Sequence, residues 1–196
     1  MKDLKERLRD KSRDKLAEHL KSSGISAEIA PRGRPEEKIK GPWWGFFLRS
    51  LGIIDVAEGP ISSIHVVKKD RGKDSPPQWW YIFLIPSEIP MAHNQTFKIS
   101  TVRRKSFPIF GKVLEVHWKG NDWGTGLARA LSEDQQINAF VSKTGDVSIR
   151  SHKKEFHGWL IRTKRFDLTS EDWKALQKVV GRLLSVSYTH LTLPTN

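Results

Sequence analysis

Three side chains around residue 120 have the types and spacing that acid–base chemistry requires. Glu115 and His117 are two residues apart in a segment of alternating polar and apolar residues, so we expect them to share one side of a strand, and Asp122 follows in the next turn. The segment 120–126 carries three glycines ahead of an expected helix, where backbone N–H groups can bind an anion. A base, an acid and an anion-binding turn would suit a small hydrolase acting on a phosphate or an ester.

No further motif in the sequence supports catalysis. The 120–126 turn has neither the Gly-Lys-Ser/Thr ending of a nucleotide-binding phosphate loop nor the GxGxxG pattern of dinucleotide-binding proteins. A nucleophile elbow, an HExxH zinc motif and the kinase motifs are also missing from the sequence. We therefore favour a locally capped turn, with Asp122 as the cap, and a protein that is not an enzyme.

A second cluster offers metal ligands. His152, Glu155 and His157 are close together in the sequence, and imidazole and carboxylate groups are ligands for zinc or manganese. Lys153 and Lys154 lie between them, and their positive charges disfavour a bound cation. We therefore expect no metal site and no cofactor. The chain also has no cysteine, which excludes disulfides, iron–sulfur clusters and thiolate zinc sites.

Positive charge is concentrated in two segments that are expected to form strand pairs. The formal net charge is +12 at pH 7; residues 98–119 contain six Lys or Arg against one acidic residue, and residues 143–165 contain seven against two. Alternation along the strands directs Lys119, Arg150 and Arg162 outward together. Such a surface attracts phosphate backbones with an affinity that falls as salt rises, whereas the competing interpretation is ordinary solubilising charge. The predicted nucleic-acid-binding residues are Arg103, Arg104, Lys105, Lys119, Arg150, Lys153, Lys154 and Arg162.

A short basic segment near the N-terminus resembles a DNA-binding motif. Arg32, Gly33 and Arg34 lie between two prolines, as in the core of an AT-hook, in which an extended Arg-Gly-Arg lies in the minor groove of A·T-rich DNA. The resemblance covers five residues. Glu36 and Glu37 follow at once and place like charge against the phosphates, so a linker is the favoured interpretation.

The elements expected to position these residues begin with a helix over 3–22, followed by a short strand at Ile25–Ala30 and a Pro-, Gly- and charge-rich linker over Pro31–Pro42. An apolar segment at 42–54 is predicted to be a short helix. Turn-rich stretches then separate four expected strands, at Ile61–Val67, Gln78–Ile85, Phe97–Arg103 and Phe110–Trp118.

The C-terminal third is expected to contain two helices around a strand pair. Gly124–Val141 is predicted to be mainly helical, with Ser132 and Gln135 at capping-box spacing, and the best helix spans Ser170–Leu184 behind a cap at Thr169 or Ser170. Strands are expected at Asp146–Ser151 and His157–Thr163. Adjacent strands without intervening helices favour an α+β fold, with a mainly antiparallel sheet of about six strands and helices packed on one face.

The chain divides into three expected parts: a basic helix and linker over 1–41, an α+β core domain over 42–185, and a tail over 186–196. The tail, VSYTHLTLPTN, resembles the translated adaptor of a sequencing library, so we expect it to be an artefact attached to a prokaryotic gene. The start of the chain is charged and no apolar stretch approaches the about 20 residues of a membrane-spanning helix. A cytoplasmic protein without a signal peptide is expected.

Three functions are therefore compatible with the sequence. The leading hypothesis is binding of DNA or RNA, or of another polyanion, through the cationic sheet surface. The second is the small hydrolase with its anion-binding turn at 120–126. The third is an interaction module in which residues 3–22 dock another protein.

Overall fold

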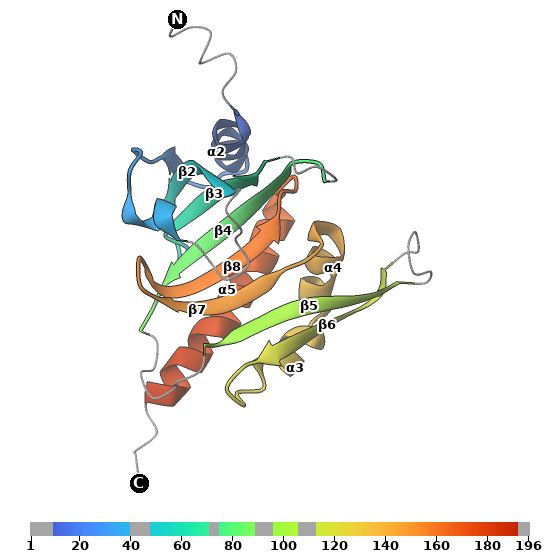
Figure 1. Ribbon diagram of the computed structural model, residues 1–196. Helices are drawn as coiled ribbons and strands as arrows, with labels where there is room; N and C mark the ends of the chain where they lie inside the picture. The colour runs from blue at the N-terminus through green and yellow to red at the C-terminus, as the bar shows by residue number, and fades with distance from the viewer. Residues whose placement is uncertain (1–9, 40–47, 71–74, 89–95, 106–112, 192–196) are drawn as a thin grey trace, which may run out of the picture.

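The computed structural model describes residues 10–39, 48–70, 75–88, 96–105 and 113–191, with the backbone alone for 105, 113, 114 and 186–191. The described elements form an α+β fold around one eight-stranded sheet (Figure 1). The predicted α+β class and antiparallel pairing are confirmed, because every neighbouring pair of strands is antiparallel. The expected number of about six strands is wrong.

The strands lie in the order β1-β2-β3-β4-β8-β7-β5-β6. A meander of β2, β3 and β4 therefore meets the β7–β8 hairpin, and the β5–β6 hairpin completes the far edge. Their bounds are β1 (Ala27–Ile29), β2 (Leu48–Val56), β3 (Ser63–Lys69), β4 (Gln78–Pro86), β5 (Lys98–Lys105), β6 (Val113–Asn121), β7 (Ser148–Lys153) and β8 (His157–Lys164).

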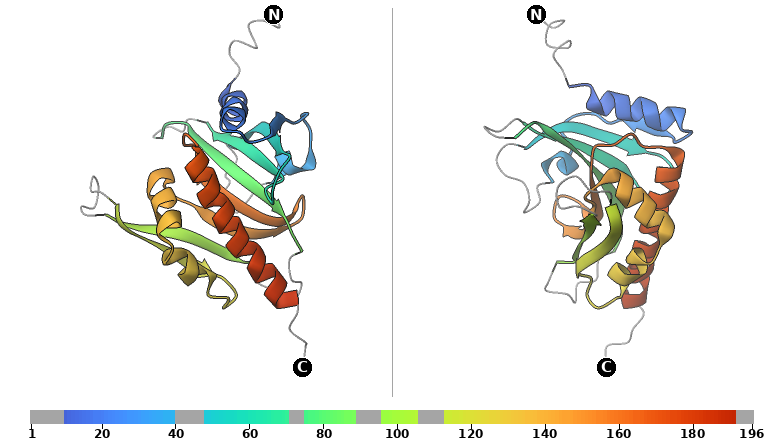
Figure 2. Two further views of the ribbon diagram at one scale, coloured as in Figure 1. Left: turned by 180° about the vertical axis from the view of Figure 1, so that it is seen from behind. Right: turned by 90° about the vertical axis from the view of Figure 1, so that its right-hand side faces the viewer.

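One face of this sheet packs against helices, and we call it the helix side. The left view of Figure 2 shows α3, α4 and α5 in front of the strands, on the face turned away from the viewer in Figure 1, with α2 across the end of the sheet near β1 and β2. The large buried cluster between these layers contains side chains of all four helices. The bounds of the helices are α2 (Ser12–Ser22), α3 (Leu127–Ser132), α4 (Gln135–Thr144) and α5 (Ser170–Leu191), and a 3-10 turn, η1, spans Pro35–Lys38.

The opposite face, which we call the distal face, carries a smaller apolar cluster over β3, β4 and β8. Its buried members are Ile39, Val67, Ile82, Leu84 and Leu160. Strands alternate their side chains between faces, so these residues are interleaved with members of the large cluster such as Phe83 and Ile161. This continuous apolar character on both faces is why β4 lies at the centre of the sheet rather than at its edge.

Two predicted helices differ from the structure. Leu48–Val56, expected as part of a helix over 42–54, is strand β2; residues 42–47 lie outside the described part. Its Ile53 and Ile54 point to opposite faces and both are fully buried, which a strand inside a two-layer core achieves. The predicted helix over 124–141 is two helices, and the cap of α4 is Asp134, which accepts from the N–H groups of Gln136 and Ile137, instead of the expected Ser132.

The C-terminal helix begins as the sequence predicts. The N–H of Asp172 donates to Thr169 Oγ1 (3.3 Å) and the N–H of Thr169 donates to Asp172 Oδ2 (2.9 Å), a reciprocal cap that fixes the first turn of α5. Lys143 of α4 makes an ion pair with the same carboxylate. The cap therefore also ties α5 to α4.

Gly158 makes the closest backbone approach in the β4–β8 pair. Its φ is +145°, and a Cβ at this position would lie 2.1 Å from the carbonyl oxygen of Ile85. We expect Gly158→Ala to destabilise the fold by about 2 kcal/mol or more, because the backbone of the central strand must move. Urea unfolding followed by circular dichroism measures the change.

The matched control is Gly181→Ala in α5, where nothing lies within 4 Å of the added Cβ. This variant should gain about 0.5–1 kcal/mol from helix propensity. Equal stability of the two variants would contradict the described packing of β8 against β4.

Candidate functional site

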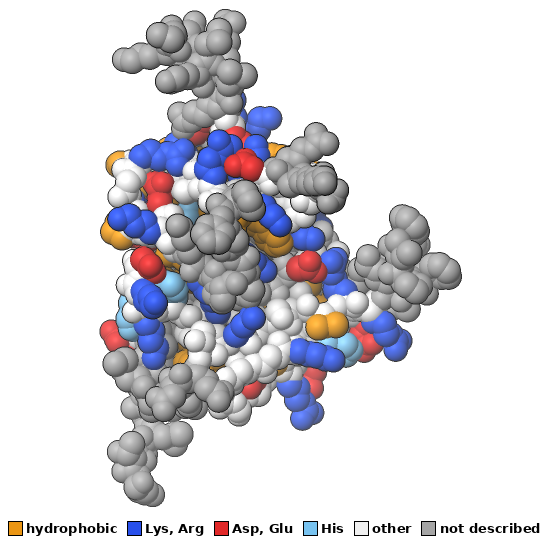
Figure 3. All heavy atoms as spheres, in the orientation of Figure 1, with side chains coloured by type: hydrophobic (Ala, Val, Ile, Leu, Met, Phe, Trp, Pro, Cys, Tyr) orange, Lys and Arg blue, Asp and Glu red, His pale blue; other side chains and the backbone are white. Residues whose placement is uncertain are grey.

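The register of the sheet brings four cationic residues from separate strands onto the distal face. Lys119, Ser100, Ser148 and Arg162 lie in line across β6, β5, β7 and β8. The adjacent row consists of Asn121, Lys98, Arg150 and Leu160. We call Lys98, Lys119, Arg150 and Arg162 the cationic patch. Figure 3 shows this face, with Lys and Arg side chains spread over it among a few acidic ones.

Two members of the cationic patch are more buried than the sequence suggested. Arg150 is only 6% exposed and Arg162 is half-buried, whereas Lys98 and Lys119 are exposed. Burial lowers the pKa of Arg150, and the positive charge of Arg162 lowers it further. The Arg162 guanidinium lies 4.5 Å from the centre of the Trp80 ring. The expectation that Arg150 projects into solvent is therefore wrong, although its face is the predicted one.

The other predicted nucleic-acid-binding residues do not all join this patch. Arg103 has the opposite parity on β5, which places it on the helix side, and makes an ion pair of 2.9 Å with Asp146. Arg104 is on the distal face, largely exposed, 3.6 Å from Glu115. Exposed Lys153 and Lys154 lie at the β7–β8 turn, and Lys105 ends β5 with a side chain outside the described part. Alternation along β5 and β7 separates these residues.

The arginines of the segment that resembles an AT-hook are engaged within the chain. Arg32 lies 3.5 Å from Glu37, and Arg34 pairs with Glu36 (2.9 Å) and with Asp55 of β2. These ion pairs raise the pKa of Arg34, with the hydrogen bonds to Glu36 as the largest cause. The two acidic residues that follow the motif thus form ion pairs with its arginines.

The residues of the hydrolase hypothesis do not form one site. Glu115 and His117 are paired (2.9 Å) and half-exposed on β6. Asp122 accepts from the N–H groups of Gly124 (3.1 Å) and Ala128 (3.2 Å), so the 120–126 turn is bound by its own carboxylate. The next side chain, Trp123, packs against the rings of Phe97 and Trp159 in the core. This turn therefore serves folding.

The two histidines of the β7–β8 hairpin contact different partners. The ring of His152 lies 2.8 Å from Glu155 Oε2, and His157 Nδ1 lies 3.1 Å from the carbonyl oxygen of Ser87. Within the part of the chain that the structure describes, no group of three or more His, Asp or Glu is arranged to hold a metal ion.

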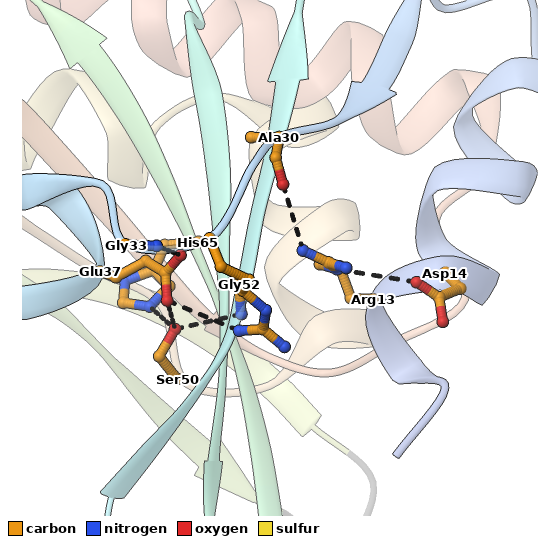
Figure 4. Close-up of polar contacts among 9 residues, drawn as sticks. Arg13, Asp14, Ala30, Gly33, Glu37, Ser50, Gly52 and His65 are labelled. Carbon is orange, nitrogen blue, oxygen red and sulfur yellow. Dashed lines mark hydrogen bonds and ion pairs between the residues drawn. The ribbon is translucent and has the colours of Figure 1, made fainter. Parts of the chain in front are cut away.

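A partly buried polar cluster that no sequence pattern predicted lies between η1 and strands β2 and β3 (Figure 4). His65 Nε2 and Ser50 Oγ are 3.0 Å apart, and Ser50 Oγ is 3.1 Å from Glu37 Oε2. The N–H of Gly52 also donates to Ser50 Oγ (3.1 Å). A β-bulge between Ser50 and Gly52 creates this contact, and a bulge has no clear signature in a single sequence.

The hydrogen bonds of this cluster argue against a serine nucleophile activated by histidine. Ser50 has one hydroxyl proton, which it donates to the Glu37 carboxylate, so His65 must carry its proton on Nε2 and donate it to Ser50. A histidine in that tautomer does not accept the serine proton. Burial lowers the pKa of His65 to about 4, which keeps the ring neutral.

The apolar side of the N-terminal helix packs against the core of the same chain. Leu16, Ala17 and Leu20 of α2 are buried in the main core. Of the helix expected over 3–22, residues 3–9 lie outside the described part, and the described residues Asp10 and Lys11 precede the first turn of α2. In the described part, no helix combines the length and apolar character needed to span a membrane. Docking through residues 3–22 stays a prediction.

Comparison with protein-family models, curated proteins and solved structures finds no match for this chain.

We expect the buried His65 to make stability fall on acidification. Between its pKa of about 6.5 when unfolded and about 4 when folded, the unfolded chain binds a proton that the folded chain does not, so the free energy of unfolding decreases as pH falls through this window. The loss is about 1.4 kcal/mol per pH unit. Urea unfolding at several pH values between these limits measures it.

The variant His65→Gln should lose this part of the pH dependence, whereas His117→Gln, at a half-exposed ring, should keep it. A wild-type slope that His65→Gln leaves unchanged would show that another group causes it.

Proposed function

We propose that the protein binds nucleic acid through the cationic patch of Lys98, Lys119, Arg150 and Arg162. The observation that carries this proposal is the register of four strands, which gathers cations from distant positions in the chain on the face away from the helices. Phosphate contacts dominate the affinity of such interfaces. The proposal is therefore one of backbone binding rather than of base recognition.

The residues between the cations have the chemistry of a phosphate-binding surface. Ser100 lies between Lys119 and Ser148, and Asn121 lies beside Lys98. Hydroxyl and amide groups donate hydrogen bonds to phosphate oxygens alongside Lys and Arg. A nucleic-acid backbone would therefore meet charged and neutral donors on β6 and β5, with Arg162 of β8 at the edge of the patch and the buried Arg150 beneath it.

Arg162 also connects the patch to an aromatic side chain. The Trp80 ring next to Arg162 adds a flat aromatic surface at the edge of the patch, of the kind on which single-stranded bases stack.

Charge reversal at the two exposed lysines tests this proposal. We expect Lys98→Glu with Lys119→Glu to weaken binding of a fluorescent single strand or duplex at least about tenfold at low salt, because two phosphate contacts become repulsive. Each lost contact should also lower the slope of log affinity against log salt by about one. Fluorescence anisotropy at several salt concentrations measures both effects.

The control replaces Lys174 and Arg182 with Glu on the exposed side of α5, which changes the net charge equally on the other side of the molecule. This pair should weaken binding less than about twofold at moderate salt, where charges beyond a Debye length are screened. Equal weakening by both pairs, or no binding by the wild type at low salt, would overturn the proposal.

A further inference from the structure

A cavity of about 370 Å³ lies between α2 and the segment that leads from β8 into α5. Figure 2 shows these two parts side by side at one end of the molecule. The volume is within the range of small-molecule sites. The lining comes from three places in the chain: Ser12, Lys15, Leu16 and His19 of α2, Tyr81 of β4, and Arg165, Phe166, Asp167 and Leu168.

The apolar part of the lining is built from aromatic and aliphatic side chains. The rings of Tyr81 and Phe166 are 6.1 Å apart and tilted, and Phe166 packs in turn on Phe140 of α4. Leu16, 4% exposed, contributes from α2. These groups offer a surface for the ring or alkyl body of a small molecule.

The cationic part of the lining is held in place by the structure around it. Arg165 Nη1 donates to Ser12 Oγ (3.2 Å), and the same guanidinium lies 4.3 Å from the centre of the Trp79 ring. Lys15, which is exposed, is the second cation and forms no ion pair with a residue in the described ranges. Asp167 is the one acidic residue among the lining residues.

Tyr81 supplies a hydroxyl group to the lining. The residue is 4% exposed, and no hydrogen bond among the described residues engages that hydroxyl. Burial raises the pKa of Tyr81 to about 12, so the hydroxyl keeps its proton and can donate it. The cavity is the space from which an acceptor reaches this group.

We infer that this cavity binds a small organic anion whose carboxylate or phosphate group is held by Lys15, Arg165 and the hydroxyl of Tyr81. The apolar body of the ligand would rest against Leu16 and Phe166, and Asp167 would accept a hydrogen bond from a ligand hydroxyl or amine. This site is on the helix side of the sheet, so it does not depend on the cationic patch or on nucleic-acid binding.

Calorimetric titration with three probes tests the inference. Phenyl phosphate and benzoate should bind saturably at millimolar concentration or below, and inorganic phosphate more weakly because it lacks the apolar body. The two ring-bearing probes distinguish a phosphate from a carboxylate site. Tyr81→Phe should weaken the preferred probe about tenfold or more, because a hydrogen bond to a charged group is lost without a change in ring packing.

Lys15→Gln, at an exposed position that folding does not require, should weaken the same probe several-fold, and the matched control Lys174→Gln should leave its affinity unchanged. If circular dichroism shows that Tyr81→Phe does not fold, the comparison of Lys15→Gln with Lys174→Gln tests the inference instead. The inference is overturned if none of the three probes binds saturably, or if the variants at Tyr81 and Lys15 bind as the wild type does.

Discussion

Burial of Trp159, Ile161 and Ile149 on the helix side is the interaction on which the arrangement of charge depends. These three side chains of the β7–β8 hairpin are fully buried in the main core. Because strand residues alternate between faces, Arg150 and Arg162 are then forced onto the distal face. Shifting this hairpin by one residue would expose the tryptophan and bury both arginines beneath the helices. Hydrophobic burial therefore fixes where the cations lie.

Strand β8 marks the boundary between two kinds of surface on the distal face. Leu160 belongs to the apolar cluster over β3 and β4, whereas Arg162, two residues later, faces the polar rows of β5, β6 and β7. Trp80 lies at this boundary, packed against the apolar cluster and in contact with Arg162. An aromatic group beside cations suits a ligand that has both charge and flat rings, as nucleic acids do.

The N-terminal part of the described chain adds a strand to the sheet and contributes polar side chains to two separate places in the fold. α2 contributes Leu16 to the core and Lys15 to the proposed anion cavity. Residues after β1 turn back so that Glu37 reaches Ser50 at the bulge of β2. The absence of a side chain at Gly52 lets the buried Arg13 approach this strand, because a Cβ there would lie 2.4 Å from its guanidinium. Segments that the sequence presents as a helix and a charged linker are thus built into the fold.

The sequence by itself determined the α+β class, most strands, the capped C-terminal helix, and the face on which Lys119, Arg150 and Arg162 lie. These features follow from the spacing of apolar and polar residues along each helix or strand, which can be read from the sequence alone. Tertiary structure decided the rest: β2 forms where a helix was expected, and Tyr81 lines one cavity with Lys15 and Arg165 only because α2 packs beside the segment before α5. Apolar runs of this length suit a buried strand or a buried helix equally, and partners far apart in the chain leave no periodic signal.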